Sequence, residues 1–176
     1  MILDGTTVLS PIGPLGLAAR GDALVGLEFA DGGRANDGWA HLARHLGPIE
    51  IRPHDDPAGA ATRLARYFDG DLAALDEQPV ELYGTVFQRA IWDALRTIRV
   101  GTTWTYAEIA ARIGRPSAVR AAGAANGANP VAVFVPCHRV IAADGTLWGY
   151  GGGLERKRWL LVHESALSKR TGTLSF

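Results

Sequence analysis

The sequence predicts an α/β fold in two parts: a small N-terminal α/β domain with a short antiparallel sheet, and a mainly helical C-terminal domain that contains a helix-turn-helix. Short apolar runs broken by glycine and proline fill the first third of the chain, whereas helical periodicity with capping residues follows residue 85. Charge divides at the same place, since residues 1–84 carry 6 basic and 13 acidic side chains and residues 85–163 carry 10 and 4. We therefore expect two domains, 1–84 with an acidic linker at its end and 85–176.

The N-terminal part is expected to contain three strands and two helices. Turn residues such as Pro11, Gly13 and Gly21 separate the apolar runs that predict the strands. The strands are predicted at 6–10, 15–20 and 24–29, and the helices at 37–45 and 57–68. The acidic segment 70–84 contains Pro79 and has no clear period, so it is interpreted as the linker.

Capping residues and apolar faces predict the helices of the C-terminal part. Thr85 caps a helix that ends by Gly101. Its apolar face consists of Phe87, Ile91, Ala94, Leu95 and Ile98. Thr105 and Glu108 form a capping box that opens the next helix, at 106–113.

Gly114 closes that helix, and after a short turn Ser117 is expected to cap a further helix running to Asn126. Helix, glycine-containing turn and helix is the geometry of a DNA-binding helix-turn-helix. An ordinary helical hairpin is the commoner meaning of the pattern alone. A last helix is predicted at 154–164.

The second helix of this pair has an unusual face of small residues around one arginine. The inward stripe is Val119, Ala122, Gly123 and Asn126, and the opposite stripe is Ser117, Arg120, Ala121 and Ala124. A major-groove reader presents long polar side chains to base edges, whereas small side chains let a helix approach a narrow groove closely. The face therefore favours docking in the minor groove of double-stranded DNA, and the charge of this basic half indicates an anionic partner.

Cys137 is the only cysteine, and it lies in the run Pro136-Cys137-His138-Arg139. A lone cysteine is usually an inert core residue. Here an imidazole and a guanidinium follow directly, and such neighbours favour the thiolate, so we predict a nucleophile. A single cysteine also excludes an intramolecular disulfide and a cysteine-rich zinc site, which is typical of a reducing compartment.

The remaining signals concern location and the last sixth of the chain. No run approaches the ~20 apolar residues of a membrane span, and the first residues lack the regions of a signal peptide. We expect a cytoplasmic protein with no membrane partner.

The glycine-rich segment 148–153 is either a flexible surface loop or a backbone able to approach a planar ligand. Arg156, Lys157 and Arg158 are interpreted as a solvated charged face.

Two of these motifs together resemble a known family. Pro136-Cys137-His138-Arg139-Val140 with Tyr150-Gly151-Gly152-Gly153 is similar to the O6-alkylguanine-DNA alkyltransferases, also called methylated-DNA–protein-cysteine methyltransferases. The resemblance is strong from Phe87 to Glu164, where it includes Asn129-Pro130, and it is weaker in the residues that precede Phe87. It implies a DNA-repair protein that transfers an alkyl group from O6-alkylguanine in DNA irreversibly to its own cysteine, acts once, and needs no cofactor.

The resemblance also implies roles for catalytic residues. Cys137 would accept the alkyl group, and His138 would act as a base through a water, oriented by Glu164. Asn129 would hold the turn that contains the cysteine. Tyr106 would crowd the target phosphate and hydrogen-bond the base.

Further roles concern DNA and the base. Arg120 would fill the gap left by a flipped nucleotide. The Val140 and Cys137 carbonyls would read the guanine amine, and the Tyr150-Gly151 backbone would lie against the base. The DNA-binding residues are taken to be Arg120, Ser117, Ala121, Ala124 and Arg139.

The chain departs from the family pattern at three positions: Arg99 replaces a frequent proline, Ala122 replaces a frequent valine, and Trp148 is bulky near the expected pocket. The cysteines of zinc-binding relatives are absent, so no metal is predicted, and a monomer is expected. Two alternatives remain: a DNA-binding damage sensor that does not repair, and a cysteine hydrolase using Cys137, His138 and Glu164. Adjacent cysteine and histidine are poorly placed for the thiol–imidazole contact of a hydrolase.

Overall fold

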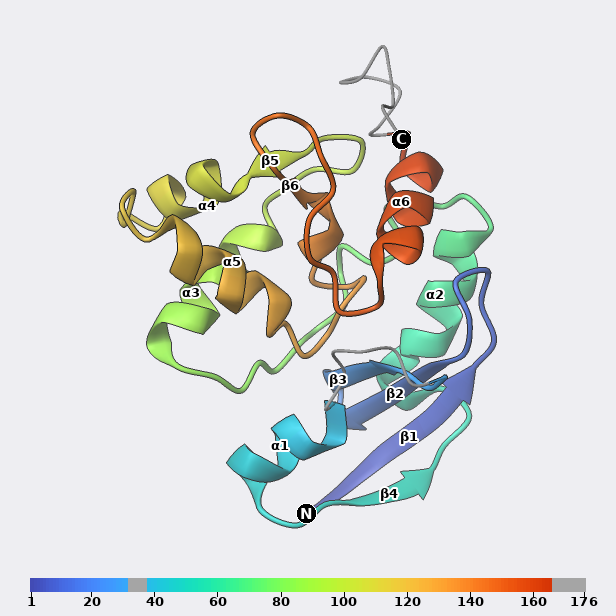
Figure 1. Ribbon diagram of the computed structural model, residues 1–176. Helices are drawn as coiled ribbons and strands as arrows, with labels where there is room; N and C mark the ends of the chain where they lie inside the picture. Colours follow the sequence, from blue (N-terminus) through green and yellow to red (C-terminus); the bar gives the residue numbers. More distant parts are fainter. Residues whose placement is uncertain (32–37, 166–176) are drawn as a thin grey trace.

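The computed structural model describes residues 1–31 and 38–165, and it combines a four-stranded sheet with a group of helices (Figure 1). The strands are β1 (Ile2–Val8), β2 (Leu15–Arg20), β3 (Ala23–Phe29) and β4 (Glu50–Pro53), in the spatial order β3-β2-β1-β4. The three predicted strands are present and antiparallel. The sheet is nevertheless mixed, because β4 pairs in parallel with β1. All four residues of β4 are exposed, so it carries no alternating apolar pattern that would have indicated a strand.

Six α-helices and two short 3-10 turns follow in the described residues. They are α1 (Gly38–Leu46), α2 (Ala60–Phe68), α3 (Val86–Leu95), α4 (Tyr106–Arg112), α5 (Val119–Gly127) and α6 (Leu154–His163), with short 3-10 turns η1 (Pro57–Gly59) and η2 (Cys137–Arg139). Two short strands, β5 (Trp104–Thr105) and β6 (Val140–Ile141), pair in parallel. Asp37, the first residue of one predicted helix, lies outside the described residues. The predicted helix 57–68 is divided because Ala58 has a left-handed φ of 54°.

The helix-turn-helix forms from α4 and α5, which contact each other directly. Its capping box is present, since Glu108 N–H donates to Thr105 Oγ1 and Thr105 N–H donates to the Glu108 carboxylate. Gly114 ends the first helix with a φ of 71°. Ser117 was predicted to cap the second helix, but it does not. The cap residue is Ala118, without a side-chain bond, because the turn is one residue longer than the pattern indicated.

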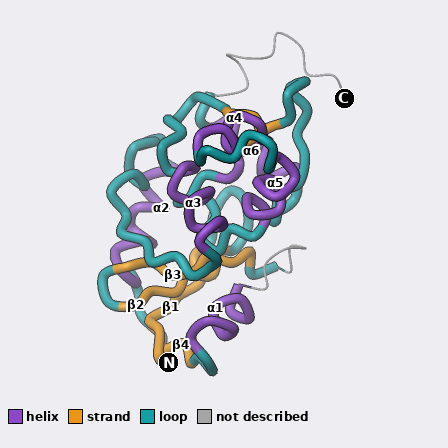
Figure 2. The backbone as a smooth tube through the Cα atoms, turned by 90° about the vertical axis from the view of Figure 1, so that its left-hand side faces the viewer, coloured by secondary structure: helices purple, strands orange, loops and turns teal. Residues whose placement is uncertain are grey.

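One hydrophobic core joins the sheet to helices α2 to α6, and a second cluster joins it to α1. Figure 2 shows the sheet with α1 on one side and the other helices above it. Strand β2 is buried on both faces. On one face α1 places Trp39 against Gly16 and Gly26, where a Cβ atom would lie 3.3 and 2.9 Å from the ring. On the other face Leu27 belongs to the same core as Trp92 of α3. The division at residue 84 therefore stays a prediction.

The outer edge of β3 holds two segments that lead to the C-terminal half. Leu24 N–H donates to the Pro79 carbonyl, and Glu81 N–H donates to the Leu24 carbonyl. Leu75 and Gln78 are buried, so 70–84 packs against the sheet rather than forming a free linker. Farther along the same edge, Leu27 N–H donates to the Pro130 carbonyl at 2.9 Å, seven residues before Cys137. Among the described helices none is long and apolar enough to cross a membrane.

Candidate active site

Cys137 begins a short 3-10 turn that is held from both sides. Asn129 Nδ2 donates to the Val135 carbonyl at 2.7 Å, and its Oδ1 accepts from Val131 N–H at 3.0 Å. Val133, between them, has a φ of 73° although it is β-branched, a strained conformation that surrounding structure must impose. Asn126 Nδ2 donates to the Cys137 carbonyl at 3.4 Å. The turn is thus fixed by buried amides, and the structure gives Asn129 the position expected for it.

The thiol itself is buried and favours its neutral form. Burial raises the pKa of the Cys137 thiol above its ordinary value, and Asn129 and the positive charge of Lys157 oppose this only in part. The sequence had indicated that the imidazole and guanidinium following Cys137 would favour the thiolate. Instead, both of these side chains bond to Glu164. Deprotonation of the thiol therefore requires a proton acceptor at the moment of reaction.

Glu164 is the centre of a buried network behind this turn. Its Oε2 accepts from Arg139 Nε at 2.8 Å, and its Oε1 accepts from Arg139 Nη2 at 3.0 Å, His138 Nε2 at 3.0 Å and the Tyr67 hydroxyl at 2.7 Å. These partners, His138 and Arg139 above all, hold the pKa of the carboxyl well below its usual range despite its burial. Arg139 is only 5% exposed and also donates to the Ile98 carbonyl. Its prediction as a DNA-binding residue is therefore wrong, because its guanidinium points into the protein.

The network fixes the protonation of His138. An ionised carboxylate only accepts hydrogen bonds, so Nε2 carries the hydrogen that lies between His138 and Glu164. Nδ1 is then the basic nitrogen, and it is buried without a hydrogen-bond partner. Burial lowers the pKa of His138, so the ring is neutral near neutral pH. A neutral imidazole with a free Nδ1 beside Cys137 is able to accept a proton.

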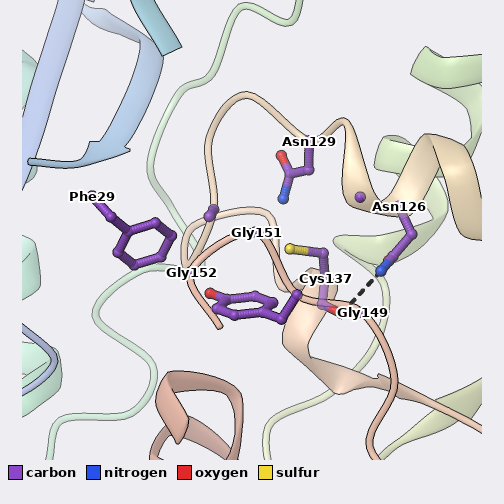
Figure 3. Close-up of a pocket in the computed structure, with 10 residues that line it drawn as sticks. Phe29, Asn126, Asn129, Cys137, Gly149, Gly151 and Gly152 are labelled. Atoms are coloured by element: carbon purple, nitrogen blue, oxygen red, sulfur yellow. Dashed lines mark hydrogen bonds between the residues drawn. The ribbon is translucent and has the colours of Figure 1, made fainter. Parts of the chain in front are cut away.

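The glycine-rich segment forms the opposite wall of a small chamber at the thiol. In Figure 3 the Cys137 sulfur points into the space between Asn129 and Phe29, with Gly149, Gly151 and Gly152 beside it. The chamber encloses about 10 Å³, room for about one water molecule. Phe29, from the end of β3, lies so near Gly152 that a Cβ there would be 2.6 Å from its ring. Only glycine fits at this position, and the N-terminal sheet contributes a wall of the chamber.

Trp148, at the start of that segment, is anchored through its backbone and its indole. Its carbonyl accepts from Lys157 Nζ at 2.7 Å and from the Tyr106 hydroxyl at 3.1 Å. The indole Nε1–H donates to Thr146 Oγ1 at 2.6 Å while the side chain remains 65% exposed. Lys157 is completely buried and its pKa is lowered to about 8 by burial. The expected solvated face of Arg156, Lys157 and Arg158 is therefore wrong for Lys157.

Arg156 has a structural role as well. Its guanidinium pairs with Asp31, donates to the Ile12 and Gly152 carbonyls, and lies 4.8 Å from the Phe29 ring centre. These contacts tie α6 and the glycine-rich segment to the N-terminal sheet. Arg156 therefore stabilises the contact between the two halves and does not belong to a solvated charged face.

A larger apolar hollow of about 630 Å³ is also lined by Gly149, Tyr150 and Gly151. Its walls include Tyr106, Val119, Arg120, Gly123 and Trp148. Gly127, Gly149, Tyr150 and Gly151 also line the chamber at Cys137, so the two spaces share a wall. Ser117, Arg120, Ala121 and Ala124 are exposed, as predicted, and Ala122 and Asn126 of the predicted inward stripe are buried. Val119 and Gly123 of that stripe are only half-buried and line the hollow with Arg120.

Two further predicted base-binding residues are Val140 and Tyr150, of which Tyr150 is part of this wall. Val140 is the buried residue that ends η2, and it pairs with Trp104 in the small sheet. Tyr150 packs edge-on against Phe29, with ring centres 5.9 Å apart. Its hydroxyl is buried without a hydrogen-bond partner. Of the predicted site residues, the chamber at the thiol is lined by Cys137, Asn129, Tyr150 and Gly151. The hollow is lined by Tyr106, Arg120, Tyr150 and Gly151, and the other predicted site residues line neither space.

The sequence analysis missed four residues of the site: Phe29, Tyr67, Asn126 as a turn partner, and Lys157. Lys157 had a usable signal, because Lys157, Leu160, Leu161 and Glu164 recur at helical spacing and so share one buried face. Phe29 and Tyr67 had none, since each lies about a hundred residues from its partners in the site. Within residues 1–31 and 38–165, no group of three or more histidine, cysteine or acidic side chains is arranged to hold a metal ion.

Comparison with known proteins places this site in a family. Residues 86–166 match the model described as 6-O-methylguanine DNA methyltransferase, DNA binding domain. The chain is 45% identical to a methylated-DNA–protein-cysteine methyltransferase of Mycolicibacterium paratuberculosis, over 98% of this chain and 99% of that protein. It is 43% identical to the Salmonella typhimurium protein of the same name, over 91% of this chain and 94% of that one.

Solved structures agree with the sequence comparison. The structure of Mycobacterium tuberculosis OGT in complex with DNA has a TM-score of 0.76 and 41% identity to this chain, covering 94% of each. The O6-methylguanine methyltransferase of the same organism has a TM-score of 0.77, also at 41% identity, over 97% of this chain and 96% of that one. The chain therefore belongs to the methylated-DNA–protein-cysteine methyltransferase family. It is a DNA-binding DNA-repair methyltransferase, with a small N-terminal sheet followed by a helical part.

Proposed function

We propose that Cys137 is the residue that accepts the alkyl group, and that the group comes from O6-alkylguanine in double-stranded DNA. The observation that carries this proposal is the position of the only thiol of the sequence, in a chamber that shares a wall with the apolar hollow below α5. A guanine in the hollow would present its O6 substituent toward the sulfur. The free space at the thiol, about 10 Å³, suits a small group such as methyl.

The chemistry follows from the groups around the thiol. The sulfur–carbon bond forms as the bond between that carbon and guanine O6 breaks. The thiol proton leaves through a water to Nδ1 of His138, which Glu164 holds in the required tautomer. The departing guanine takes up a proton. Tyr106 lines the hollow, and its hydroxyl would turn from the Trp148 carbonyl to donate its hydrogen to the base, which lowers the barrier for departure.

The product is a thioether, and no group in the site is suited to cleave one. The protein therefore acts once per molecule. The geometry does not favour the cysteine hydrolase, because His138 Nε2 is bonded to Glu164 and Nδ1 has no hydrogen-bond partner, the thiol included. The unreacting damage sensor is disfavoured by the intact thiol and its neighbouring base.

The target atom lies within the stacked duplex, so the nucleotide must be flipped into the hollow. The small exposed face of α5, with Ala121 and Ala124, and Ser117 in the turn before it suit close approach to the minor groove. Arg120 lines the hollow and is the long side chain of that face, so it would occupy the space that the base leaves. We further propose that the protein acts as a monomer in the cytoplasm, without a cofactor.

Intact-mass measurement tests the proposal. After incubation with duplex DNA that contains O6-methylguanine, the protein should gain one methyl group, on the peptide that contains Cys137. Cys137→Ser should gain none while still binding DNA, and the same duplex with unmodified guanine should leave the protein unchanged. Several turnovers per molecule, or a methyl group on another residue, would show that the proposal is wrong.

A further inference from the structure

One contact of the Glu164 network comes from the other half of the chain. Tyr67, on α2, donates its hydroxyl hydrogen to Glu164 Oε1 at 2.7 Å across a separation of 97 residues. The whole Tyr67 residue is inaccessible to solvent, and the Glu164 side chain is equally buried. This oxygen is the one that also accepts from His138 Nε2. The tyrosine therefore contacts the carboxylate at the atom that orients the proposed base.

The ring of Tyr67 is fixed independently of this hydrogen bond. It packs edge-on against Phe68, with ring centres 5.2 Å apart, and against His163, with ring centres 5.0 Å apart. The backbone carbonyl of Tyr67 is 2.8 Å from His163 Nε2. Because α2 and the end of α6 are held together by these contacts, the hydroxyl has a defined position. Removing it alone would leave the packing in place.

Tyr67 is able to act only as a donor to Glu164. Burial and the charge of Glu164 raise the pKa of its phenol far above the ordinary value, so the hydroxyl keeps its hydrogen. Glu164 is ionised and only accepts. With Arg139 on both oxygens and Tyr67 on Oε1, the carboxylate has one orientation toward the histidine. His138 consequently presents Nε2–H to Glu164 and leaves Nδ1 for the thiol proton.

We propose that Tyr67 is a positioning residue for alkyl transfer, whose hydroxyl holds Glu164 so that His138 keeps Nδ1 available as the proton acceptor. This inference rests on the proposed function of Cys137 and His138. It assigns the N-terminal half a direct part in the chemistry, in addition to its wall of the chamber. A tyrosine that only filled space between the halves would need its ring and not its hydroxyl.

A positioning role for the Tyr67 hydroxyl and a purely space-filling role for its ring predict different dependences of the transfer rate on pH. The charged and titratable groups that act on His138 are Glu164, Arg139 and Lys157, and Cys137 precedes it in the chain. Without the Tyr67 hydrogen bond, negative charge on Glu164 is less dispersed and favours the imidazolium more strongly. His138 would then lose its basic form at a higher pH. The acid side of the pH–rate profile should therefore move upward.

The experiment uses Tyr67→Phe, which keeps the ring, and Tyr83→Phe as the matched control. Tyr83 belongs to the same half, and its hydroxyl accepts from Arg20 near the surface. Single-turnover transfer from duplex DNA with O6-methylguanine is measured from about pH 5 to 9, together with DNA affinity. We expect Tyr67→Phe to be about ten-fold slower near neutral pH, as for loss of a charge-assisted hydrogen bond, with its acid limb at higher pH and its affinity for DNA unchanged. Tyr83→Phe should match the wild type.

Two results would overturn the inference. One is a folded Tyr67→Phe protein whose rate and pH profile equal those of the wild type. The other is a ¹⁵N NMR spectrum of the wild type in which His138 carries its hydrogen on Nδ1, a measurement that does not depend on any variant folding. If the wild-type protein itself transfers no alkyl group to Cys137, the proposed function fails. That outcome can be told apart from the two results that would overturn the role of Tyr67.

Discussion

Residues 1–84 and residues 85–165 both reach the active site, but by different means. The C-terminal half carries Cys137, His138 and Glu164 on adjacent elements, η2 and the end of α6, and it holds the excess of basic charge. The N-terminal half is acidic and contributes through two single side chains, Phe29 at the chamber and Tyr67 at Glu164. One half supplies the groups that we propose to react and to bind DNA, and the other fixes the surroundings of the thiol and of Glu164. The continuous core between them makes such remote support available.

The largest expected effect lies where the two halves meet in the buried network. Glu164→Gln leaves Arg139 buried without its counter-charge, so we expect a loss of about 3–5 kcal/mol in the free energy of unfolding. Glu81→Gln removes the exposed partner of Arg20, whose ion pair spans 3.4 Å with side chains 47% and 44% exposed. Its effect should stay within about 0.5 kcal/mol. Urea denaturation near neutral pH measures both.

The pH dependence of the Glu164 effect has a defined sign. The folded pKa of this carboxyl lies below its unfolded value of about 4.3, so its contribution is complete above that pH and is lost as pH falls through the folded value. The stability difference between wild type and Glu164→Gln should therefore shrink in acid. A difference that grows below about pH 4 would contradict an ionised Glu164 in the folded protein.

The charge difference between the halves predicts where DNA binds. Binding releases counterions from the phosphates, so affinity for duplex DNA should fall on the order of a hundred-fold or more between about 50 and 200 mM salt. Arg115→Gln, in the turn of the helix-turn-helix, should lower the slope of log affinity against log salt by about one. Arg66→Gln, on α2, should leave that slope unchanged. Fluorescence anisotropy with a labelled duplex gives the slopes, and equal effects of the two variants would remove the distinction between the halves.

The smallest expected effect separates the two roles available to Arg120 within the C-terminal half. If Arg120 fills the gap left by a flipped nucleotide, Arg120→Ala should slow transfer from duplex DNA by about ten-fold, because flipping costs a few kcal/mol. Transfer from the free O6-alkylguanine base should change little, since there is no stack to open. Rapid-quench measurements compare the two substrates. An equal slowing of both would mean that Arg120 supports the pocket instead.

The local elements and the reacting thiol could be predicted from the sequence. The cap at Thr85 and the capping box at Thr105 depend on residues within one helical turn of each other, so pattern alone located them. The first of these helices nevertheless ends at Leu95, before the predicted end at Gly101. The run around Cys137 and its resemblance to a family supplied the chemistry. Strand β4 was missed because its exposed residues carry no pattern, and the cap at Ser117 failed because the turn length depends on how α4 and α5 pack.

The direction and burial of the charged side chains were decided only by the tertiary structure. Arg139 and Lys157 looked like surface cations in the sequence, yet one pairs with Glu164 and the other bonds to the Trp148 carbonyl. Phe29 and Tyr67 reach the site because β3 and α2 pack against segments about a hundred residues away, a distance over which no periodicity carries information. The sequence by itself indicated which group we propose to react and which helices we propose to face DNA. Folding determined the protonation of that group and of its base, because pKa values depend on burial and on partners that only the assembled core brings together.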